Sequence, residues 1–383
     1  MKNYDYKYMY EKFYILNLLK NYIHHNNETN LADLDWDIIA LYSKIQNLDG
    51  ILYVQTKKNE FLNGFAASIY SYKQKKYEQK KVIDCFRING IECFIVKGTC
   101  IAELYTEPYL RTMGDSDIII HENDLCKADE IMLSLGYICK GRPHNHEWTY
   151  LGNNQEFEIH SALLYKDYRY DNEMLKFGND IWNHVNKGVL DWDFHFIYLI
   201  LHLRKHIMGE GSGIRQFLDL AVVIENVNLD WNNIEFIAKK INIYEFLGTV
   251  LFFLKSWFEI DIPFEEINIS DEFFEFATNE IFEDGLFGHR DKKNSKNTLL
   301  YNVNKNGNKI VYKNLIKAFF IPYKDIIEFK EYSFVKGRPY FLPIAWIYRA
   351  LKKRKKIAFF WKSNVVTRDE INERMNYLKK WNV

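Results

Sequence analysis

Two short stretches of this chain carry residue types that could bind a metal ion and a phosphate. The first is an apolar run that ends in Lys97-Gly98-Thr99, and the second starts with Asp115-Ser116-Asp117 and continues into three isoleucines. Residues two apart on a strand project from the same face, so Asp115 and Asp117 can lie side by side. Two carboxylates at one strand end form a hard-oxygen site for Mg²⁺, and the metal would hold a phosphate-bearing substrate.

A simpler interpretation is that Asp115 and Asp117 are turn residues that precede a strand. We favour the metal site because the chain also offers Lys97 and Glu158 as partners. Glu158 is two residues from His160 in another predicted strand, so these two side chains share a face. Glu158 alone could be an edge-strand charge, and His160 could orient a carboxylate, bind phosphate or simply pack.

The elements that must position these residues alternate between helix and strand. A helix over 82–89 is expected to stop at Gly90, and the β-rich run 91–96 predicts a buried strand. After it we expect a helix over 100–105, a strand over 117–121, a helix over 122–135 and a hairpin of strands 147–151 and 157–160.

Composition limits the classes of function. The chain has 383 residues, and its 51 Lys and Arg balance its 51 Asp and Glu. A formal net charge of zero argues against a whole-protein electrostatic grip on nucleic acid, so a nucleic-acid partner is not favoured. With 48% hydrophobic and 27% charged residues, the profile is that of a soluble globular protein.

The cysteines and the apolar runs indicate a cytoplasmic protein. There are five cysteines and no CxxC pair, which predicts reduced thiols and neither a disulfide framework nor a zinc site. The N-terminal residues are polar and lack the apolar core of a signal peptide. No apolar run approaches the roughly 18 residues that a membrane-spanning helix needs.

Four regions are expected. Residues 1–80 read as helices that form a packing region or lid, and residues 81–165 form the mixed core. Residues 166–290 predict a helical bundle that packs on the core, and residues 291–383 a helical region with a basic tail. The fold class is therefore α+β, with a small mixed sheet inside a mostly helical protein.

The order of elements over residues 82–162 resembles the nucleotidyltransferase fold, and more narrowly the family of uncharacterised nucleotidyltransferase-like proteins. The resemblance covers residues 85–225 well and the C-terminal third loosely. The residues that carry it are Val96-Lys97-Gly98-Thr99, Tyr105, Arg111 to Asp117, Leu135-Gly136-Tyr137 and Glu158-Ile159-His160, followed by His202, His206, Arg215 and Asp219.

This resemblance implies that three carboxylates bind a divalent metal, Mg²⁺ or Mn²⁺, and carry the catalysis. Asp115 and Asp117 match the pair on one strand, and Glu158 matches the third carboxylate on a neighbouring strand. The metal would bridge the phosphates of an NTP and activate the incoming hydroxyl, so catalysis would rest on positioning and charge neutralisation.

The resemblance also implies a phosphate-binding turn at Gly98 and Thr99, where the family fold normally has Gly-Ser. Backbone N–H groups at a helix start favour an anion, and Thr99 can supply a hydroxyl. Lys97 adds a point charge suited to phosphate, and Arg111 is a second candidate. A lysine directly before the glycine is similar to phosphotransferases as well, so nucleotidyl and phosphoryl transfer both stay open.

The leading hypothesis is a Mg²⁺-dependent enzyme that moves an NMP group from an NTP to a hydroxyl acceptor of unknown identity. One alternative is a kinase on the same scaffold. The other is a catalytically degenerate protein used for binding or assembly.

His202 and His206 are four residues apart and share a helix face. The residues between them lack the Glu of a HExxH zinc motif. With Arg215 and Asp219, this face could line a cleft that receives the acceptor, or it could be a structural polar network.

Two further patterns can be explained without a specific function. His144-Asn145-His146 has no paired ligand at metal spacing and predicts an exposed hairpin loop. The basic run Lys352–Lys356 precedes the aromatic stretch 357–361 and could dock on anionic lipid or RNA, although most such runs are solvated faces.

Overall fold

The computed structural model describes residues 8–26, 34–141, 147–167, 169–209, 211–265, 267–285, 320, 322–327, 330–352 and 368–383. The chain divides into two compact units. The first contains residues 1–207, 211–288 and 382–383, and the second contains residues 208–210 and 289–381.

Helices form the chain before the sheet: α1 (Met9–Ile23), α2 (Trp36–Gln46), α3 (Asp49–Thr56) and α4 (Leu62–Ile88). The carboxylate of Asp35 caps α2 by accepting from two backbone N–H groups. Helix α4 is continuous across residue 80, where the sequence predicts a boundary between regions. The predicted stop at Gly90 is confirmed, because Gly90 has a φ of +72° directly after the helix.

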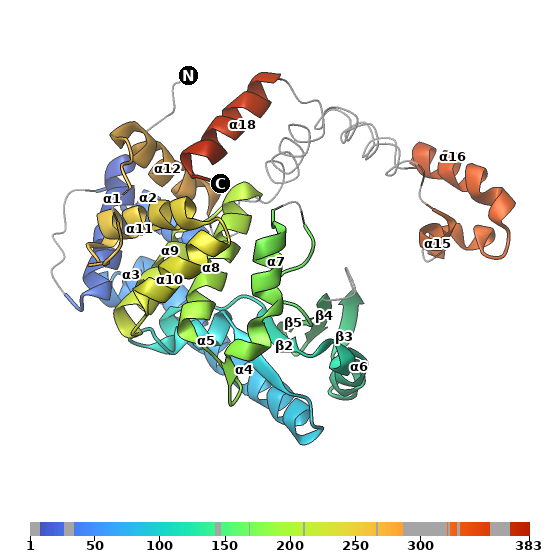
Figure 1. The fold of residues 1–383 in the computed structure, drawn as a ribbon. Helices are drawn as coiled ribbons and strands as arrows, with labels where there is room; N and C mark the ends of the chain where they lie inside the picture. Colours follow the sequence, from blue (N-terminus) through green and yellow to red (C-terminus); the bar gives the residue numbers. More distant parts are fainter. Residues whose placement is uncertain are drawn as a thin grey trace. The chain divides into compact units, whose positions relative to one another are not determined.

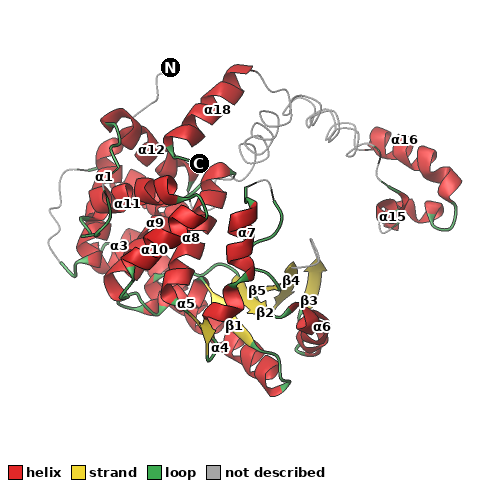
Figure 2. Cartoon of the chain, viewed as in Figure 1, coloured by secondary structure: helices red, strands yellow, loops and turns green. Residues whose placement is uncertain are grey.

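The sheet of the first unit is mixed, which confirms the α+β class (Figure 2). Its strand order is β1-β2-β5-β4-β3. Strands β2 and β5 pair in parallel, and the other neighbours pair antiparallel. The strands are β1 (Cys93–Val96), β2 (Ser116–Ile120), β3 (Ile138–Gly141), β4 (Glu147–Gly152) and β5 (Gln155–His160). Helices α5 (Gly98–Ala102) and α6 (Leu125–Ser134) follow β1 and β2.

The two faces of this sheet have different characters. On one face, buried Ile118 and Ile159 form an apolar core with Val82 and Phe86 of α4 and Met132 of α6. Figure 1 shows α6 beside β3 at one edge of the sheet. Because side chains alternate along a strand, the residues between these core positions project from the opposite face. The carboxylates of interest lie in that second set.

A helical bundle follows the sheet. Strands β6 (Val185–Asn186) and β7 (Val189–Leu190) form a short ribbon that the sequence did not predict. The helices are α7 (Asn172–Asn179), α8 (Trp192–Met208), α9 (Ile214–Asn226), α10 (Trp231–Lys240), α11 (Tyr244–Phe258) and α12 (Asp271–Asp284). Both α8 and α9 are rich in buried apolar residues, so their few polar side chains stand out.

The second unit contains α15 (Tyr323–Ile326), α16 (Leu342–Lys352) and α18 (Arg368–Lys380). Buried Ile326, Tyr332, Val335 and Ala345 form a small apolar cluster within it. In the basic run, Lys352 is the last residue of α16, and residues 353–356 lie outside the described residues. Over the described residues, no helix has both the length and the apolar character needed to cross a membrane.

Candidate active site

The parallel pairing of β2 and β5 places two carboxylates next to each other. In the register of this pair, Asp117 is opposite Glu158, and Ile119 is opposite His160. Asp117, Glu158 and His160 therefore share the sheet face that is turned away from the apolar core. The structure therefore brings Glu158 and His160 to the strand next to that of Asp117.

His160 joins the two carboxylates. Its Nε2 lies 3.2 Å from Asp117 Oδ1 and 3.3 Å from Glu158 Oε2. Burial alone would lower the pKa of His160, but the hydrogen bonds to both carboxylates raise it to about 9. The imidazole is therefore protonated at neutral pH and acts as a counter-charge for the two acids.

Lys97 supplies a second counter-charge. Its Nζ lies 2.9 Å from Asp117 Oδ1 and 5.9 Å from the centre of the Tyr198 ring on α8. Burial opposes ionisation of Asp117, yet the ammonium of Lys97 and the bond to His160 hold its pKa well below the usual range. Asp117 is therefore a carboxylate between two cations.

The backbone at Lys97 has a strained conformation. Lys97 has a φ of 57° and a ψ of −143°, a conformation that favours glycine. Its backbone N–H donates to Nε2 of His195 on α8 over 3.2 Å. His195 is fully buried, and burial, with Lys97 and Arg111 nearby, lowers its pKa to about 3. The neutral imidazole of His195 can therefore accept this bond and hold the turn.

Three side chains have the chemistry of a metal-ion site. Within the part of the chain that the structure describes, Asp117, Glu158 and His160 can each offer a ligand atom, and these atoms lie within 4.8 Å of one another. Two carboxylates and one imidazole suit Mg²⁺ or Mn²⁺. The donor set therefore fits a divalent cation, whose charge would replace the proton on His160 and the ammonium of Lys97 as the counter-charge of the two carboxylates.

Asp115 lies outside that group of three. It precedes β2 and is exposed, while Asp117 is buried. Partial loss of hydration and the charge of Asp117 raise the pKa of Asp115. The buried side chain of Lys75 on α4 donates to the backbone oxygen of Gly114, directly before Asp115. The loop that carries Asp115 is thus held by Lys75, which no motif in the sequence indicated.

A buried hydrogen-bond chain connects the Lys97-Gly98-Thr99 turn to the start of β2. The Thr99 hydroxyl donates to Gln79 Oε1 over 2.7 Å, and Gln79 Nε2 donates to Ser116 Oγ over 2.8 Å. Gln79 is on α4, one turn after Lys75. The Thr99 hydroxyl, expected to face phosphate, is bonded to protein here. Gly98 has a φ of +41° and opens α5, which has only 5 residues.

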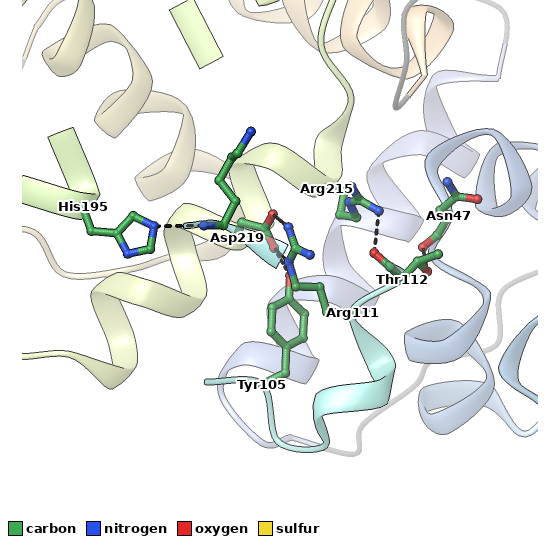
Figure 3. Close-up of polar contacts among 8 residues, drawn as sticks. Asn47, Tyr105, Arg111, Thr112, His195, Arg215 and Asp219 are labelled. Carbon is green, nitrogen blue, oxygen red and sulfur yellow. Dashed lines mark hydrogen bonds and ion pairs between the residues drawn. The ribbon is translucent and has the colours of Figure 1, made fainter. Parts of the chain in front are cut away.

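Arg111 also has a protein partner in place of the phosphate that we expected. Its Nε and Nη2 each donate to a different oxygen of Asp219, both over 2.8 Å. The Tyr105 hydroxyl donates to the same carboxylate over 2.7 Å. All three side chains are buried. Figure 3 shows this cluster beside Arg215, whose Nη1 donates to the backbone oxygen of Thr112 over 2.8 Å.

His202 and His206 face each other on α8, with 3.1 Å between their Nε2 atoms. Burial lowers the pKa of His206 to about 3 and moves the pKa of His202 well below its ordinary value. They form a neutral pair on the helix that also carries His195 and Tyr198. Positions 195, 198, 202 and 206 follow helical spacing. From the predicted His202 and His206, this spacing leads back to His195 and Tyr198, which were not predicted. His144 and His146 lie outside the described residues.

A comparison with models of protein families found a match. A family model described as "Uncharacterised nucleotidyltransferase" matches residues 38–259. That range contains α4, the sheet and the bundle helices α8 and α9, and therefore every side chain of the site. The comparison with curated proteins found no match, and neither did the comparison with solved structures.

Proposed function

Because the chain belongs to the uncharacterised nucleotidyltransferase family, we propose that it transfers a nucleotidyl group from an NTP to a hydroxyl acceptor with the help of a divalent cation. The observation that carries this proposal is the parallel register of Asp117 with Glu158. Two carboxylates side by side on one sheet face, with Asp115 two residues before the first, suit metal-assisted transfer at phosphorus.

Asp117 and Glu158 would hold the cation, and Asp115 and His160 are next to them for further ligation or orientation. When bound, the cation would neutralise charge on the phosphate oxygens and promote ionisation of the acceptor hydroxyl. The strained turn at Lys97 places an ammonium beside Asp117, where it can contact a phosphate oxygen. His195 holds that turn by accepting from the Lys97 backbone.

Phosphoryl transfer is the second candidate, and Lys97 is the observation in its favour. The ammonium of Lys97 belongs to the carboxylate site, because its Nζ is 2.9 Å from Asp117. A lysine in that place could stabilise the γ-phosphate of an NTP while a kinase reaction transfers this phosphoryl group.

Incubation with labelled nucleotides tests both reactions. Each NTP, labelled with ³²P at the α- or the γ-phosphate, is mixed with the protein, Mg²⁺ or Mn²⁺ and pools of sugar, peptide, lipid or RNA acceptors. Transfer of the α-label with release of pyrophosphate supports nucleotidyl transfer. Transfer of the γ-label with formation of a nucleoside diphosphate contradicts it and supports the kinase. Transfer of neither label, by a protein that also fails to bind nucleotide, contradicts both.

A further inference from the structure

Two arginines lie close together but have different surroundings. Arg111 is in the loop that leads to β2, and Arg215 is on α9. Arg111 is neutralised by Asp219, which it contacts through two nitrogens. Because Tyr105 donates to the same carboxylate, the acceptor capacity of Asp219 is largely used. The charge of Arg111 is therefore already paired within the protein.

Arg215, on the first turn of α9, lacks such a partner. Among the described residues, its side chain makes one hydrogen bond, to the backbone oxygen of Thr112, and no ion pair. Its Nε is buried without a hydrogen-bond partner in the same set. Burial and the nearby charge of Arg111 lower the pKa of Arg215 to about 10, so the guanidinium is still charged at neutral pH. A cation that lies beside another arginine and forms no ion pair among the described residues costs free energy, which an anionic ligand would recover.

The place of Arg215 connects it to the carboxylate site. Thr112, whose backbone oxygen it contacts, precedes Asp115 by three residues in the same loop. The negative charge of Asp115 is near enough to influence the guanidinium. Arg215 is only partly buried as a whole. Guanidinium groups bind phosphate oxygens through paired N–H donors.

We propose that Arg215 binds a phosphoryl group of the nucleotide's polyphosphate, the role that the sequence motif assigned to Arg111. This inference rests on the proposed function, because it takes the ligand to be an NTP. The two arginines then have different roles, since Arg111 holds the loop to α9 and Arg215 contacts the substrate.

The inference is tested by a binding measurement on the full chain, with inorganic pyrophosphate, ATP and adenosine as probes in the presence of Mg²⁺. Arg215→Met should weaken the binding of pyrophosphate and ATP by about tenfold or more, the effect of losing one charge-assisted hydrogen bond. Adenosine, which has no phosphate, should bind both forms alike. Pyrophosphate should also raise the Tm of the wild type more than that of the variant.

Arg204→Met is the matched control, because Arg204 on α8 also donates to a backbone oxygen, that of Arg169. It should leave pyrophosphate binding unchanged. Arg215→Lys keeps the charge without the planar fork and should bind with intermediate affinity. Without ligand, Arg215→Met should unfold at the wild-type Tm or above, because it removes a charge that forms no ion pair among the described residues and that Arg111 repels.

Two results would overturn the inference, and they differ in scope. If Arg215→Met and Arg215→Lys bind pyrophosphate and ATP as the wild type does, Arg215 is not the phosphate contact, and the proposed function is unaffected. If the wild type itself binds neither ATP nor pyrophosphate, the proposed function fails and this inference fails with it.

Discussion

Arg111 and Asp219 form a buried, two-pronged ion pair that joins the loop before β2 to helix α9 (Figure 3). Each bond is 2.8 Å long, the length of a strong charge-assisted hydrogen bond. Both side chains are buried, with 6% of the Arg111 and 9% of the Asp219 side chain exposed. This pair fixes the loop that carries Asp115 against the helical bundle, so it supports the site without belonging to it.

Breaking this pair should destabilise the protein. Arg111→Met leaves a buried, uncompensated carboxylate at Asp219 and should lower the free energy of unfolding by about 3–5 kcal/mol, measured by denaturant titration. The double variant Arg111→Met, Asp219→Leu removes both charges and should recover most of that loss. A single variant as stable as the wild type would contradict a structural role for the pair.

Gln79 should matter for stability because it joins the Lys97-Gly98-Thr99 turn to the start of β2. Gln79→Leu leaves the buried hydroxyls of Thr99 and Ser116 without this partner, at a cost of about 1–3 kcal/mol for each unsatisfied group. Denaturant unfolding measures the loss. The control is Gln74→Leu on the same helix, where the amide makes one exposed bond to Asn153 and the change should be small. Equal stabilities of the two variants would contradict the linking role.

Because His195 is buried, the free energy of unfolding should decrease as the pH is lowered. Its pKa is about 3 in the folded protein and about 6.5 when unfolded, so the unfolded state binds more protons between these values. The contribution of His195 to the free energy of unfolding is fully present above pH 6.5. It is lost as the pH falls below that value, with a slope of about 1.4 kcal/mol per pH unit. Between pH 6 and 4, unfolding free energies of His195→Gln should depend less steeply on pH than those of the wild type.

His195→Gln is suited to this comparison because a glutamine oxygen can still accept from the backbone N–H of Lys97. Carboxylates titrate in the same range, but they are common to both proteins and cancel in the difference. Parallel pH profiles would mean that His195 takes up a proton in the folded state at its ordinary pKa.

Strand alternation is a local rule, and it predicted which residues share a face. The place of Glu158 on a strand next to that of Asp117 was instead implied by the family resemblance, because the pairing of β2 with β5 joins distant parts of the chain. The two-residue spacing of Glu158 and His160 put both on one face, and the short strand 117–121 put Asp117 at its start. These features needed no knowledge of distant parts of the chain.

The partners of these residues could not be predicted in the same way. Gln79 and Lys75 reach the site because α4 packs along the sheet, and His195 reaches Lys97 across 98 positions of sequence. Arg111 was expected at phosphate because it precedes the acidic motif, but its preference for Asp219 depends on where α9 packs. Long-range packing, which no local period encodes, decides these contacts.

The carboxylates should be essential to the reaction. Asp117→Asn and Glu158→Gln should each lower the rate of transfer by at least about a hundredfold, since the site works by stabilising charge. Glu122→Gln, which removes an exposed carboxylate just beyond the other end of β2, should keep the wild-type rate. Thermal unfolding of all three variants shows whether a lost rate reflects a lost fold.

The most direct test of the central claim is pyrophosphate release from α-labelled NTP by wild-type protein and by Asp117→Asn, after treatment with EDTA and after return of Mg²⁺ or Mn²⁺. The account predicts transfer of the α-label and release of pyrophosphate only by the wild type and only with the metal restored. Equal release by Asp117→Asn, or release that persists in EDTA, would contradict a catalytic metal at Asp117 and Glu158.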